Sequence, residues 1–589
     1  MTFDKFLYRL AFVLELVING SFVVLYSTSR WWKSPALIPA NIVEKVLDFG
    51  VYVVPVVLGI VVIANLLHSK SLESFFRKHI FSLMVVTPLF ISYGDKEFTL
   101  LLAAAHLVSS ILSLYDGSAE PIKDLIHDEE EGEDRNQKRS IYNLIVGITL
   151  SPAQLVLISF IAVILLGTFL LMLPFASAVG KSLSFIDALF MATSATCVTG
   201  LSTVSIGTEL SFFGQAVILA LIQIGGLSIM TLYSSMVILL GRTMGMKDRV
   251  VLQDLLDVGS LEELFAMIVN IIKYTFFIEL WGGIVLTIGF IFEGFEFGKA
   301  IYYGFFHSVS AFCNAGFSLF DTSLESYDTN IMLNGTIGLL IVLGGLGFIV
   351  LRELVDVASR KKQLLNLTLH SKVVIITSGV LTVLGAVFIF FSEYLGALDS
   401  YNFFQKIQVS LFQSITLRTA GFNTLPLGNL HSYTIIMMTL FMFIGASPGS
   451  TGGGIKTTSL AILVQSIIST LKGRKNVTIL DRRISEAIIV RTTAITFISL
   501  IIVSSFILIM MKFEPEQSFL TIFFEVISAS GTVGLSLGIT PELSLLGKIA
   551  ISTAMFIGRI GPLTLVLAIG QRNVKLGKYE LPEGRMLIG

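Results

Sequence analysis

The sequence contains little charge for its length. Asp, Glu, Lys and Arg make up 14% of its 589 residues, whereas soluble globular domains carry about 25%. Hydrophobic residues make up 54%, and the mean hydropathy is +0.84. This composition cannot cover a water-facing surface of this size, so it excludes a soluble globular protein and indicates a polytopic protein of the lipid bilayer. The net charge of −1 does not suggest nucleic-acid binding, and we expect no nucleic-acid partner.

Cysteine is nearly absent. Cys197 and Cys313 are the only two, which excludes a disulfide scaffold and a zinc cluster. The sequence has no HExxH motif and no paired membrane aspartates, so a membrane-embedded enzyme such as an intramembrane protease is not indicated. We therefore predict that the protein is not an enzyme, with no catalytic residues and no organic cofactor.

Long apolar runs are abundant. A membrane-spanning helix needs about 20 apolar residues, and runs of this kind precede the most polar stretch of the chain at about 5–27, 45–67, 79–95 and 98–116. The first run has no small-residue cleavage site, so we interpret it as a retained helix rather than a signal peptide. These runs predict an N-terminal transmembrane extension over 1–117, followed by a charged cytosolic linker over 118–150.

Four short segments resemble one another, and we call them the glycine loops. They are TCVTGL (196–201), FCNAGF (312–317), LRTAGF (417–422) and SGTVGL (530–535). Their glycines recur at intervals of roughly 105–116 residues, as in an internal repeat. Each loop follows an apolar segment that is too short to span a membrane. One long apolar helix precedes each short segment, and another follows its loop. This predicts an all-α polytopic fold of four repeats, each with a long helix, a short helix with its glycine loop and a second long helix, arranged as a ring around one axis.

The repeats define the predicted domains. They are pore repeats 1 to 4 over 151–250, 251–362, 363–476 and 477–571, followed by a C-terminal tail over 572–589. Lys and Arg gather between the repeats and in the tail, whereas the first three glycine loops are followed by stretches without them. The positive-inside rule therefore places the inter-repeat loops and the tail in the cytosol, and the glycine loops open to the outside.

The residue types of the glycine loops suit a dehydrated cation. Glycine permits positive φ, so a carbonyl group can turn toward an axis without obstruction from a Cβ atom. Four such loops around one axis would replace the water shell of an ion with carbonyl oxygens. The loops contain no carboxylate, which favours a monovalent cation over a divalent one.

The second long helix of the third repeat is interrupted by SPGSTGGGIKTT (447–458). Irregular backbone at membrane depth is tolerated where it is buried in protein or lines a watery cavity, so this segment is predicted to project into the pathway. Lys456 either repels a waiting cation there or extends to the cytosol beside a helix kink. The string also resembles the phosphate-binding loop GxxxxGK[ST], but Ile455 separates its last glycine from Lys456 and its flanks are apolar helices, so nucleotide binding is not expected.

Several of these stretches together resemble the Trk/Ktr/HKT superfamily of potassium transporters, in particular membrane subunits of the KtrB and TrkH type. The matching stretches are ATCVTGL, FHSVSAFCNAGF, LRTAGFNT, FEVISASGTVGLS, SPGSTGGGIKTT, MFIGRIGPLTL and PEGRMLIG, within about 150–589. The resemblance implies a fold of four M1–P–M2 pore repeats with pseudo-fourfold symmetry around a central pore, and potassium uptake through a gated selectivity filter. It does not account for about residues 1–150, nor for Cys197 and Cys313, which are interpreted either as buried packing residues or as a thiol pair.

The resemblance also implies which residues contact the ion and which form the gate. Filter contacts fall on the glycine of each loop and the two residues before it, namely Val198, Thr199, Gly200, Asn314, Ala315, Gly316, Thr419, Ala420, Gly421, Thr532, Val533 and Gly534. The gate comprises Gly449, Ser450, Thr451, Gly452, Gly453, Gly454 and Lys456, together with Arg559. A serine in place of the first filter glycine accompanies sodium selectivity in this family, so Gly200 favours potassium as the transported ion.

Other polar residues near these segments have two interpretations each. Arg559 either pairs with the gate loop near the pore or forms a structural ion pair with a carboxylate. His307 and Glu525 are expected to anchor the short helices by hydrogen bonds rather than bind the ion. Arg418 is expected to pin the third glycine loop by bonding its carbonyl groups from behind.

The resemblance implies a homodimer on a cytosolic ring of nucleotide-binding regulatory subunits of the KtrA or TrkA type, in the plasma or bacterial inner membrane. The coupling ion stays open. The alternative function is an ion-coupled secondary transporter of a small organic solute, which would place polar groups at unwound mid-membrane helices.

Overall fold

The computed structural model describes residues 152–178, 182–227, 261–360, 363–474 and 476–562, with residues 17–23 and a few single positions before residue 104. The chain divides into two compact parts, Met1–Thr149 and Leu150–Gly589. In the first part the described positions are helical. Most of the predicted N-terminal extension, the charged linker and the C-terminal tail lie outside the described residues, so these remain predictions.

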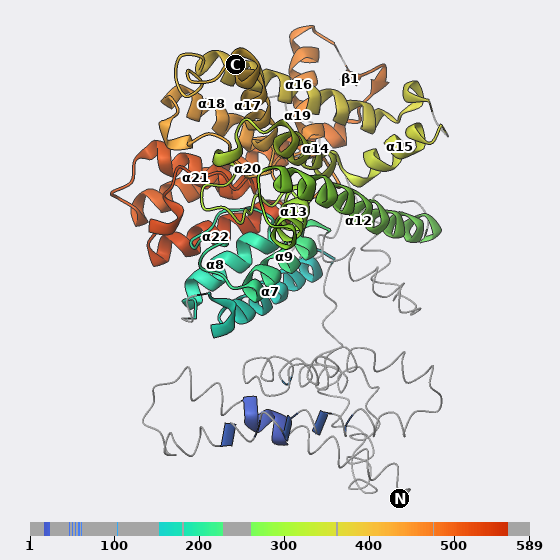
Figure 1. Cartoon of the computed structure of the whole chain (residues 1–589). Coiled ribbons are helices and arrows are strands. Elements are labelled where there is room, and N and C mark those ends of the chain that lie inside the picture. The colour runs from blue at the N-terminus through green and yellow to red at the C-terminus, as the bar shows by residue number, and fades with distance from the viewer. Residues whose placement is uncertain are drawn as a thin grey trace, which may run out of the picture. The chain divides into compact units, whose positions relative to one another are not determined.

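The described part of Leu150–Gly589 is almost entirely helical, in four successive groups (Figure 1). The first group contains α7 (Pro152–Leu171), η1 (Pro174–Ala176), α8 (Phe185–Thr196) and α9 (Phe212–Gly226). The second contains α12 (Leu261–Phe292), α13 (Phe297–Phe312), η2 (Glu325–Tyr327), α14 (Ile331–Leu346) and α15 (Phe348–Ala358). In each group a long helix leads to a shorter one, and a glycine loop follows.

The third group contains η3 (Leu364–Asn366), α16 (Leu369–Ser392), α17 (Phe403–Thr416), η4 (Leu427–Asn429), α18 (Ser432–Phe443) and α19 (Thr457–Leu471). A two-residue hairpin of β1 (Thr478–Ile479) and β2 (Arg482–Arg483) follows it. The fourth group contains α20 (Glu486–Phe513), α21 (Phe519–Gly531), η5 (Thr540–Glu542) and α22 (Leu545–Ile560).

Short polar side chains fix where many of these helices begin. The side chain at the N-cap accepts a hydrogen bond from the backbone N–H three residues later, which satisfies a donor that the first turn leaves free. Helices α8, α9, α14, α16, α17, α21 and α22 begin in this way, after Ser184, Ser211, Asn330, Thr368, Asn402, Ser518 and Ser544. The polar residue before each apolar run is thus the local signal that starts the helix.

Helix length separates spanning from non-spanning segments. Among the described residues, three helices are long and apolar enough to cross a membrane: Val269–Phe292, Leu369–Ser392 and Glu486–Phe513. The short helices α8, α17 and α21 have 12, 14 and 13 residues, so each extends about 18–21 Å, less than the bilayer core of about 30 Å. These lengths agree with the prediction of short apolar helices before the glycine loops.

The second long helix of the second group is not continuous. α14 and α15 meet at an angle of 111°, and the break falls at Gly347, whose φ is +92°. The long helix predicted after the second glycine loop is therefore divided into two at Gly347. Glycine takes this φ without the steric cost that a Cβ atom would add, which makes the sharp corner possible.

Neighbouring groups pack through equivalent helices. The helix after each glycine loop contacts the short helix of the next group: α9 contacts α13, α14 contacts α17, and α18 contacts α21. α22 of the last group contacts α8 of the first, and the two lie side by side in Figure 1. The four groups therefore form a closed ring of contacts.

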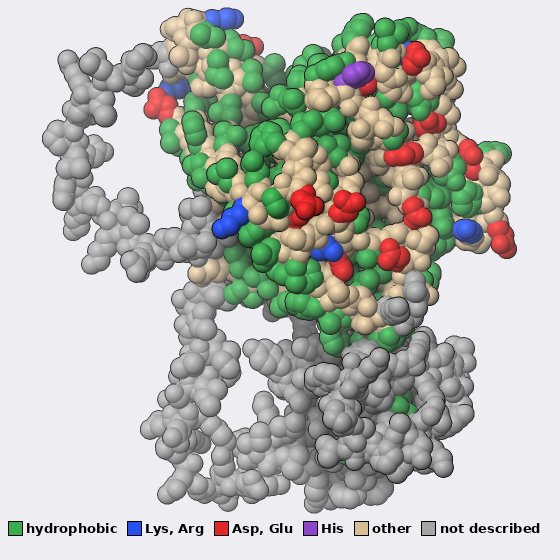
Figure 2. Space-filling model, turned by 90° about the vertical axis from the view of Figure 1, so that its left-hand side faces the viewer, with side chains coloured by type: hydrophobic (Ala, Val, Ile, Leu, Met, Phe, Trp, Pro, Cys, Tyr) green, Lys and Arg blue, Asp and Glu red, His purple; other side chains and the backbone are tan. Residues whose placement is uncertain are grey.

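The outer surface of the long helices is apolar. Phe277 on α12, Leu384 on α16 and Phe497 on α20 are exposed. Figure 2 shows one face of the described part, where hydrophobic side chains cover much of the surface and acidic side chains are scattered among them. Exposed apolar surface on this scale marks an interaction surface, and on long apolar helices it indicates contact with lipid.

Candidate functional site

The four glycine loops share one backbone conformation. The residue two before each glycine adopts positive φ, which is uncommon without glycine: Val198 (57°), Asn314 (59°), Thr419 (67°) and Thr532 (53°). The glycines themselves also adopt positive φ, with Gly200 at 101°, Gly316 at 71°, Gly421 at 79° and Gly534 at 91°. Because β-branched residues rarely take this conformation, its recurrence indicates that all four loops are held in the same turn.

The backbone N–H groups of the loops are tied back to the short helices. Thr199, Ala315 and Val533 donate from their backbone N–H to the carbonyl oxygens of Ser194, Ser310 and Ser528, each at 2.8 Å. The third loop differs, because Ala420 donates to the Thr416 carbonyl at 3.1 Å. Ile415 occupies the position of those three serines in the third loop, so this loop lacks the hydroxyl group found in the others.

The carbonyl groups of the twelve predicted filter residues are unused. Within the described part of the chain, no residue donates a hydrogen bond to any of their oxygens. Buried carbonyl groups are nearly always partnered in folded proteins. Several loop hydroxyls, including those of Thr196, Thr199 and Ser530, are also buried without a partner among the described residues. Neutral oxygens in this number suit a dehydrated monovalent cation.

The loops contact one another in a closed cycle. A methyl group placed on Gly200 would lie 2.4 Å from the Ala315 carbonyl oxygen, and one on Gly316 would lie 2.6 Å from that of Ala420. A methyl group on Gly421 would lie 2.7 Å from the Val533 carbonyl oxygen, and one on Gly534 would lie 2.0 Å from that of Thr199. Each loop thus presents a carbonyl group to the glycine of its neighbour, and only glycine fits at these positions.

The short helices end at the loops. α8, α13, α17 and α21 end at Thr196, Phe312, Thr416 and Gly531. A helix C-terminus carries the negative end of the helix dipole. Four such ends beside the loops make this region electrostatically favourable for a cation, and the low dielectric of a membrane strengthens the effect.

His307 and Glu525 occupy equivalent positions, nine residues before Gly316 and Gly534. His307 shares hydrogen bonds with the Tyr303 carbonyl at 2.8 Å and the Ser318 hydroxyl at 3.1 Å. Glu525 accepts hydrogen bonds from the hydroxyls of Ser536 and Thr540. Both side chains join a short helix to the chain beyond its glycine loop, which confirms the expected anchoring.

The hydrogen bonds of Arg418 lead away from its glycine loop. Its guanidinium donates to the Ser378 carbonyl at 3.1 Å and to the Ser378 hydroxyl at 3.0 Å. Ser378 lies on α16, so Arg418 joins the third loop to that helix and does not bond the loop carbonyls, contrary to expectation. The sequence alone does not show which hydrogen-bond acceptors surround Arg418 in the folded protein.

Both cysteines are fully buried and free of disulfide bonds. The Cys313 thiol has polar neighbours, with the Gln223 amide oxygen at 3.7 Å and a Glu279 carboxyl oxygen at 3.8 Å. The interpretation of Cys313 as a small apolar packing residue is therefore incomplete.

The predicted interruption of the third group's second helix is present. α18 ends at Phe443 and α19 begins at Thr457, and the segment between them, residues 444–456, is irregular; we call it the 444–456 loop. The Gly453 N–H donates to the Thr532 hydroxyl at 3.0 Å, and the Thr451 hydroxyl donates to the Phe312 carbonyl at 3.3 Å. A methyl group on Gly452 would lie 2.1 Å from the Thr419 hydroxyl oxygen. The loop therefore lies directly against three of the four glycine loops.

The corner between α14 and α15 holds the 444–456 loop on its other side. The Ser447 N–H donates to the Gly345 carbonyl at 3.0 Å, and the Phe348 N–H donates to the Gly449 carbonyl at 3.0 Å. A methyl group on Gly347 would lie 2.5 Å from the Pro448 carbonyl oxygen. Sequence reasoning missed this contact, although the paired glycines of GGLG (344–347) were an available signal.

Arg559 links three groups of helices. From α22 its guanidinium donates to the Thr451 carbonyl in the 444–456 loop and to the Gly225 carbonyl at the end of α9. The expected contact with this loop is present, and its recorded partners are carbonyl oxygens rather than a carboxylate. Lys456 donates to the Gly452 carbonyl at 2.9 Å and forms the N-cap of α19.

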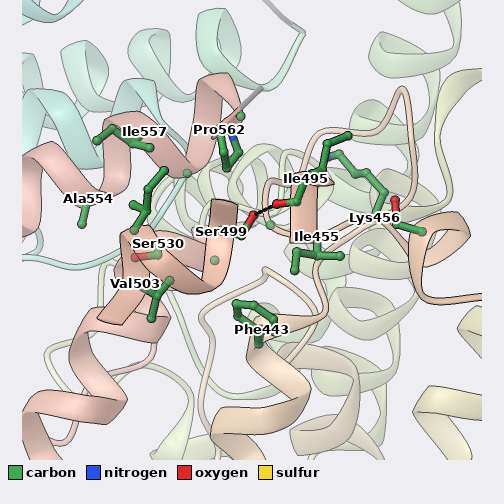
Figure 3. A pocket seen from close by; sticks show the side chains of 16 residues that line it. Phe443, Ile455, Lys456, Ile495, Ser499, Val503, Ser530, Ala554, Ile557 and Pro562 are labelled. Carbon is green, nitrogen blue, oxygen red and sulfur yellow. Dashed lines mark hydrogen bonds between the residues drawn. The ribbon is translucent and has the colours of Figure 1, made fainter. Parts of the chain in front are cut away.

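A cavity of about 250 Å³ lies beside the 444–456 loop (Figure 3). Phe443, Ile455 and Lys456 line it from the third group, Val503 lines it from α20, and Ile557 lines it from α22. Ser530 of the fourth glycine loop also reaches it. Its lining is mainly apolar, so the cavity is not part of the oxygen-rich region between the loops.

Three strings in this region match hydrolase or nucleotide motifs in letters alone. GASPG (445–449) and GLSLG (534–538) fit the pattern GxSxG, and 449–457 resembles a phosphate-binding loop. A nucleophile elbow and a phosphate-binding loop both join a strand to a helix. None of these three strings follows a strand in the described structure. They therefore do not indicate hydrolysis or nucleotide binding.

Comparison with known proteins identifies the family of this chain. A family model described as TrkH, a cation transport protein, matches residues 150–574. The chain is 38% identical over 445 residues to the Ktr system potassium uptake protein B of Bacillus subtilis, an alignment that covers 75% of this chain and 98% of that protein. It is 37% identical, with the same coverage, to the potassium/sodium uptake protein NtpJ of Enterococcus hirae.

A solved structure shares the fold. The crystal structure of the potassium transporter TrkH from Vibrio parahaemolyticus matches with a TM-score of 0.54 and 15% sequence identity, covering 97% of this chain and 99% of that one. With a match over most of its length and relatives above 30% identity, the chain belongs to the Trk/Ktr family of cation transport proteins, as a membrane subunit and not an enzyme.

Proposed function

We propose that this protein takes up potassium ions through a selectivity filter made of the twelve carbonyl-bearing residues of the four glycine loops. The closed cycle of contacts between the loops, whose carbonyl groups accept no hydrogen bond from the described residues, carries this proposal. Potassium is the proposed ion because the relatives from Bacillus subtilis and Enterococcus hirae are named as potassium or potassium/sodium uptake proteins, and because Gly200 occupies the first loop.

The proposed architecture has four pore repeats with pseudo-fourfold symmetry around one pathway. Equivalent loop conformations and the cyclic packing of α9, α14, α18 and α22 on the next short helix support it. The four repeats then correspond to the predicted domains 151–250, 251–362, 363–476 and 477–571. The protein would reside in the plasma or bacterial inner membrane, with the glycine loops open to the outside.

We propose that the 444–456 loop is the gate. It lies against three glycine loops, so it would block an ion that leaves the filter. Arg559 holds it through the Thr451 carbonyl, and Lys456 adds a positive charge next to it. Opening requires the loop to move, which breaks the bond from Arg559.

The proposed partners follow from family membership. Two copies of this chain would form a homodimer, and a cytosolic ring of nucleotide-binding subunits would regulate the gate. The names of the Bacillus subtilis relatives, which describe parts of a Ktr system, support a multi-component assembly. The coupling ion is not part of this proposal.

Gly200→Ser tests the filter. A methyl group already meets the Ala315 oxygen at 2.4 Å, and Gly200 has φ of 101°, so a serine side chain must displace the loop and one of its carbonyl groups. We expect purified protein in liposomes to conduct potassium and rubidium, and Gly200→Ser to shift the reversal potential under bi-ionic potassium/sodium conditions toward sodium. A tenfold loss of selectivity corresponds to about 1.4 kcal/mol.

Gly298→Ser is the matched control. This glycine lies in the first turn of α13, and no atom lies within 4 Å of an added methyl group. Its reversal potential should equal that of the unmodified protein. Liposomes that pass neither potassium nor rubidium under any gradient, but accumulate a labelled organic solute, would refute the filter and support a solute transporter.

A further inference from the structure

Glu279 is a buried carboxyl group inside a membrane-spanning helix. It lies on α12 within the predicted span Val269–Phe292, and 5% of the residue is exposed. The described residues provide no cationic side chain in direct contact with it. An ionisable residue at this depth is costly and marks a functional site by default.

Its neighbours are neutral. The Gln223 amide donates to one carboxyl oxygen at 3.4 Å, and the Cys313 thiol lies 3.8 Å from the other. Both contacts are long, and neither partner carries a charge. Burying a carboxylate without a compensating charge costs far more than burying the neutral acid, so such a group tends to bind a proton.

The surrounding helices offer no other titratable partner. α14 and α9 carry no titratable side chain within their described bounds. The titratable side chains of α13 each have other partners. Lys299 lies over the rings of Phe295 and Tyr303, and Tyr302 donates to Gln215. His307 bonds to Tyr303 and Ser318. On α12 itself, Lys273 and Tyr274 are five or more residues away in sequence. Among the described residues, Cys313 is the titratable group in contact with Glu279, and Arg559 of α22 lies beyond it at the end of α9.

A chain of contacts joins Glu279 to Arg559. A methyl group on Gly226 would lie 2.7 Å from the Cys313 sulfur atom, and Arg559 donates to the carbonyl of the adjacent Gly225. The same guanidinium bonds the Thr451 carbonyl in the 444–456 loop. Glu279 is therefore linked, through Cys313 and the end of α9, to the residue that holds this loop.

We propose that Glu279, Gln223 and Cys313 form a proton-binding site behind the second glycine loop, and that loss of this proton weakens the hold of Arg559 on the 444–456 loop. The proton comes from water and returns to it, and no other bond is made or broken at the site. The neutral acid leaves Arg559 on the Thr451 carbonyl and keeps the gate closed, whereas the carboxylate attracts Arg559 and favours opening. This inference rests on the proposed gating function.

Rubidium flux through the full-length protein in liposomes tests the coupling, with pH varied equally on both sides from about 5 to about 9. We expect flux to rise about tenfold as pH rises, and Glu279→Gln to stay at the low-pH level throughout. Arg559→Met should also remove the pH dependence, because the competing cation is gone. Glu296→Gln, which removes an exposed carboxylate between α12 and α13, should retain the profile of the unmodified protein.

Infrared difference spectra between low and high pH test the proton site without ion flux. We expect the carbonyl band of a protonated carboxylic acid in the unmodified protein and a weaker band in Glu279→Gln. If Glu279→Gln does not fold, Gln223→Met serves instead. That change removes a donor to the carboxylate, so the midpoint of the flux profile should move to higher pH by about one unit.

Three outcomes would overturn the proposal: flux independent of pH, a Glu279→Gln profile like that of the unmodified protein, or identical infrared spectra. A flux profile that follows sodium concentration at fixed pH and disappears in Glu279→Gln would identify a sodium site and also refute the proton site. Absent ion flux with the infrared band present would refute the proposed function but retain the proton site.

Discussion

Arg559 is the residue on which most connections of the site converge. Its guanidinium joins α22, the 444–456 loop and the end of α9 through carbonyl oxygens. A buried guanidinium is tolerated where it has several acceptors, because each charge-assisted hydrogen bond offsets part of the cost of removing it from water. The residue therefore acts as one of the bridges that hold the 444–456 loop, beside the bonds to Gly345, Phe348 and Thr532.

Removing this bridge should free the 444–456 loop. A hydrogen bond to a charged group is worth about 1.5–3 kcal/mol. We therefore expect Arg559→Met to raise rubidium flux in liposomes by roughly tenfold or more if loop opening limits flux. Arg491→Met, at an exposed position on α20, is the control for loss of an arginine and should leave flux unchanged. Equal flux in both variants would contradict a restraining role for Arg559.

At the scale of the element, the corner between α14 and α15 supports the 444–456 loop. The corner depends on Gly347, because its φ of +92° suits glycine and an added methyl group would lie 2.5 Å from the Pro448 carbonyl oxygen. The interrupted helix of the third group and the bent helix of the second thus fit against each other. Each irregular segment supplies hydrogen-bond partners for backbone groups that the other leaves free, so each stabilises the other.

Gly347→Ala should disturb this corner. The strained φ and the contact with Pro448 predict a loss of about 1–3 kcal/mol in stability. Gly335→Ala, on the same helix α14, has no atom within 4 Å of the added methyl group and should be neutral or slightly stabilising. Thermal unfolding of the two variants in detergent measures the difference. Equal midpoints would show that the corner tolerates a side chain.

The junction between α16 and α18 predicts a pH dependence. Glu393 directly follows α16, and burial alone would raise the pKa of its carboxyl group. Four hydrogen bonds outweigh burial and hold the pKa below its usual value. They come from the Thr434 hydroxyl, the backbone N–H groups of His431 and Ala397, and the His431 ring. The ionised group therefore stabilises the fold above the ordinary pKa of about 4.3. This stability is lost as pH falls through the lowered pKa of the folded state.

We expect the thermal midpoint of the protein to fall below about pH 4, and Glu393→Gln to fall less over the same range. Glu516→Gln, in the segment between α20 and α21, removes an exposed carboxylate and is the control. A Glu393→Gln variant that loses stability with acid as steeply as the unmodified protein would assign the acid sensitivity to other groups.

For the whole molecule, the contact between α22 and α8 closes the ring of helix groups. Lys548 on α22 forms an ion pair with Asp187 on α8 at 2.7 Å, and both side chains are partly buried. The pKa of Asp187 is affected first by burial, which raises it, but hydrogen bonds from Lys548 and Ser184 outweigh this and lower it. The pair therefore joins two segments 361 residues apart in sequence.

A double-mutant cycle measures what this ion pair contributes to closure. Asp187→Asn and Lys548→Met should each lower thermal stability, and the double variant should lose less than their sum. We expect a coupling of about 0.5–1 kcal/mol, because the pair is only partly buried. Strict additivity would show that apolar packing between α22 and α8 closes the ring without help from the charges.

The sequence predicted those features that depend on local chemistry. Four glycine loops at regular spacing, short helices before them and the interruption at 447–458 all follow from which residues can occupy a given backbone conformation or length of membrane. The anchoring by His307 and Glu525 also follows, because a polar side chain buried near a loop needs nearby acceptors or donors.

Features that depend on distant partners could not be predicted. The acceptors of Arg418 lie on α16, forty residues earlier, and those of Arg559 lie in two other groups of helices. Glycine also occurs within uninterrupted helices of this chain, so a glycine alone does not predict a bend. The bend at Gly347 depends on the 444–456 loop that packs against it. The polar environment of Glu279 likewise arises from three elements that only the tertiary fold brings together.

The 444–456 loop comes from one helix group alone, and this has a consequence for how such a protein can change. A channel assembled from identical subunits would repeat any plug four times, and four copies would crowd the same narrow space. In the proposed architecture, a single polypeptide that encodes its four repeats separately can place one gate beneath the filter and vary it without altering the other three repeats. Regulation can then evolve in one repeat while the geometry of the proposed filter is preserved.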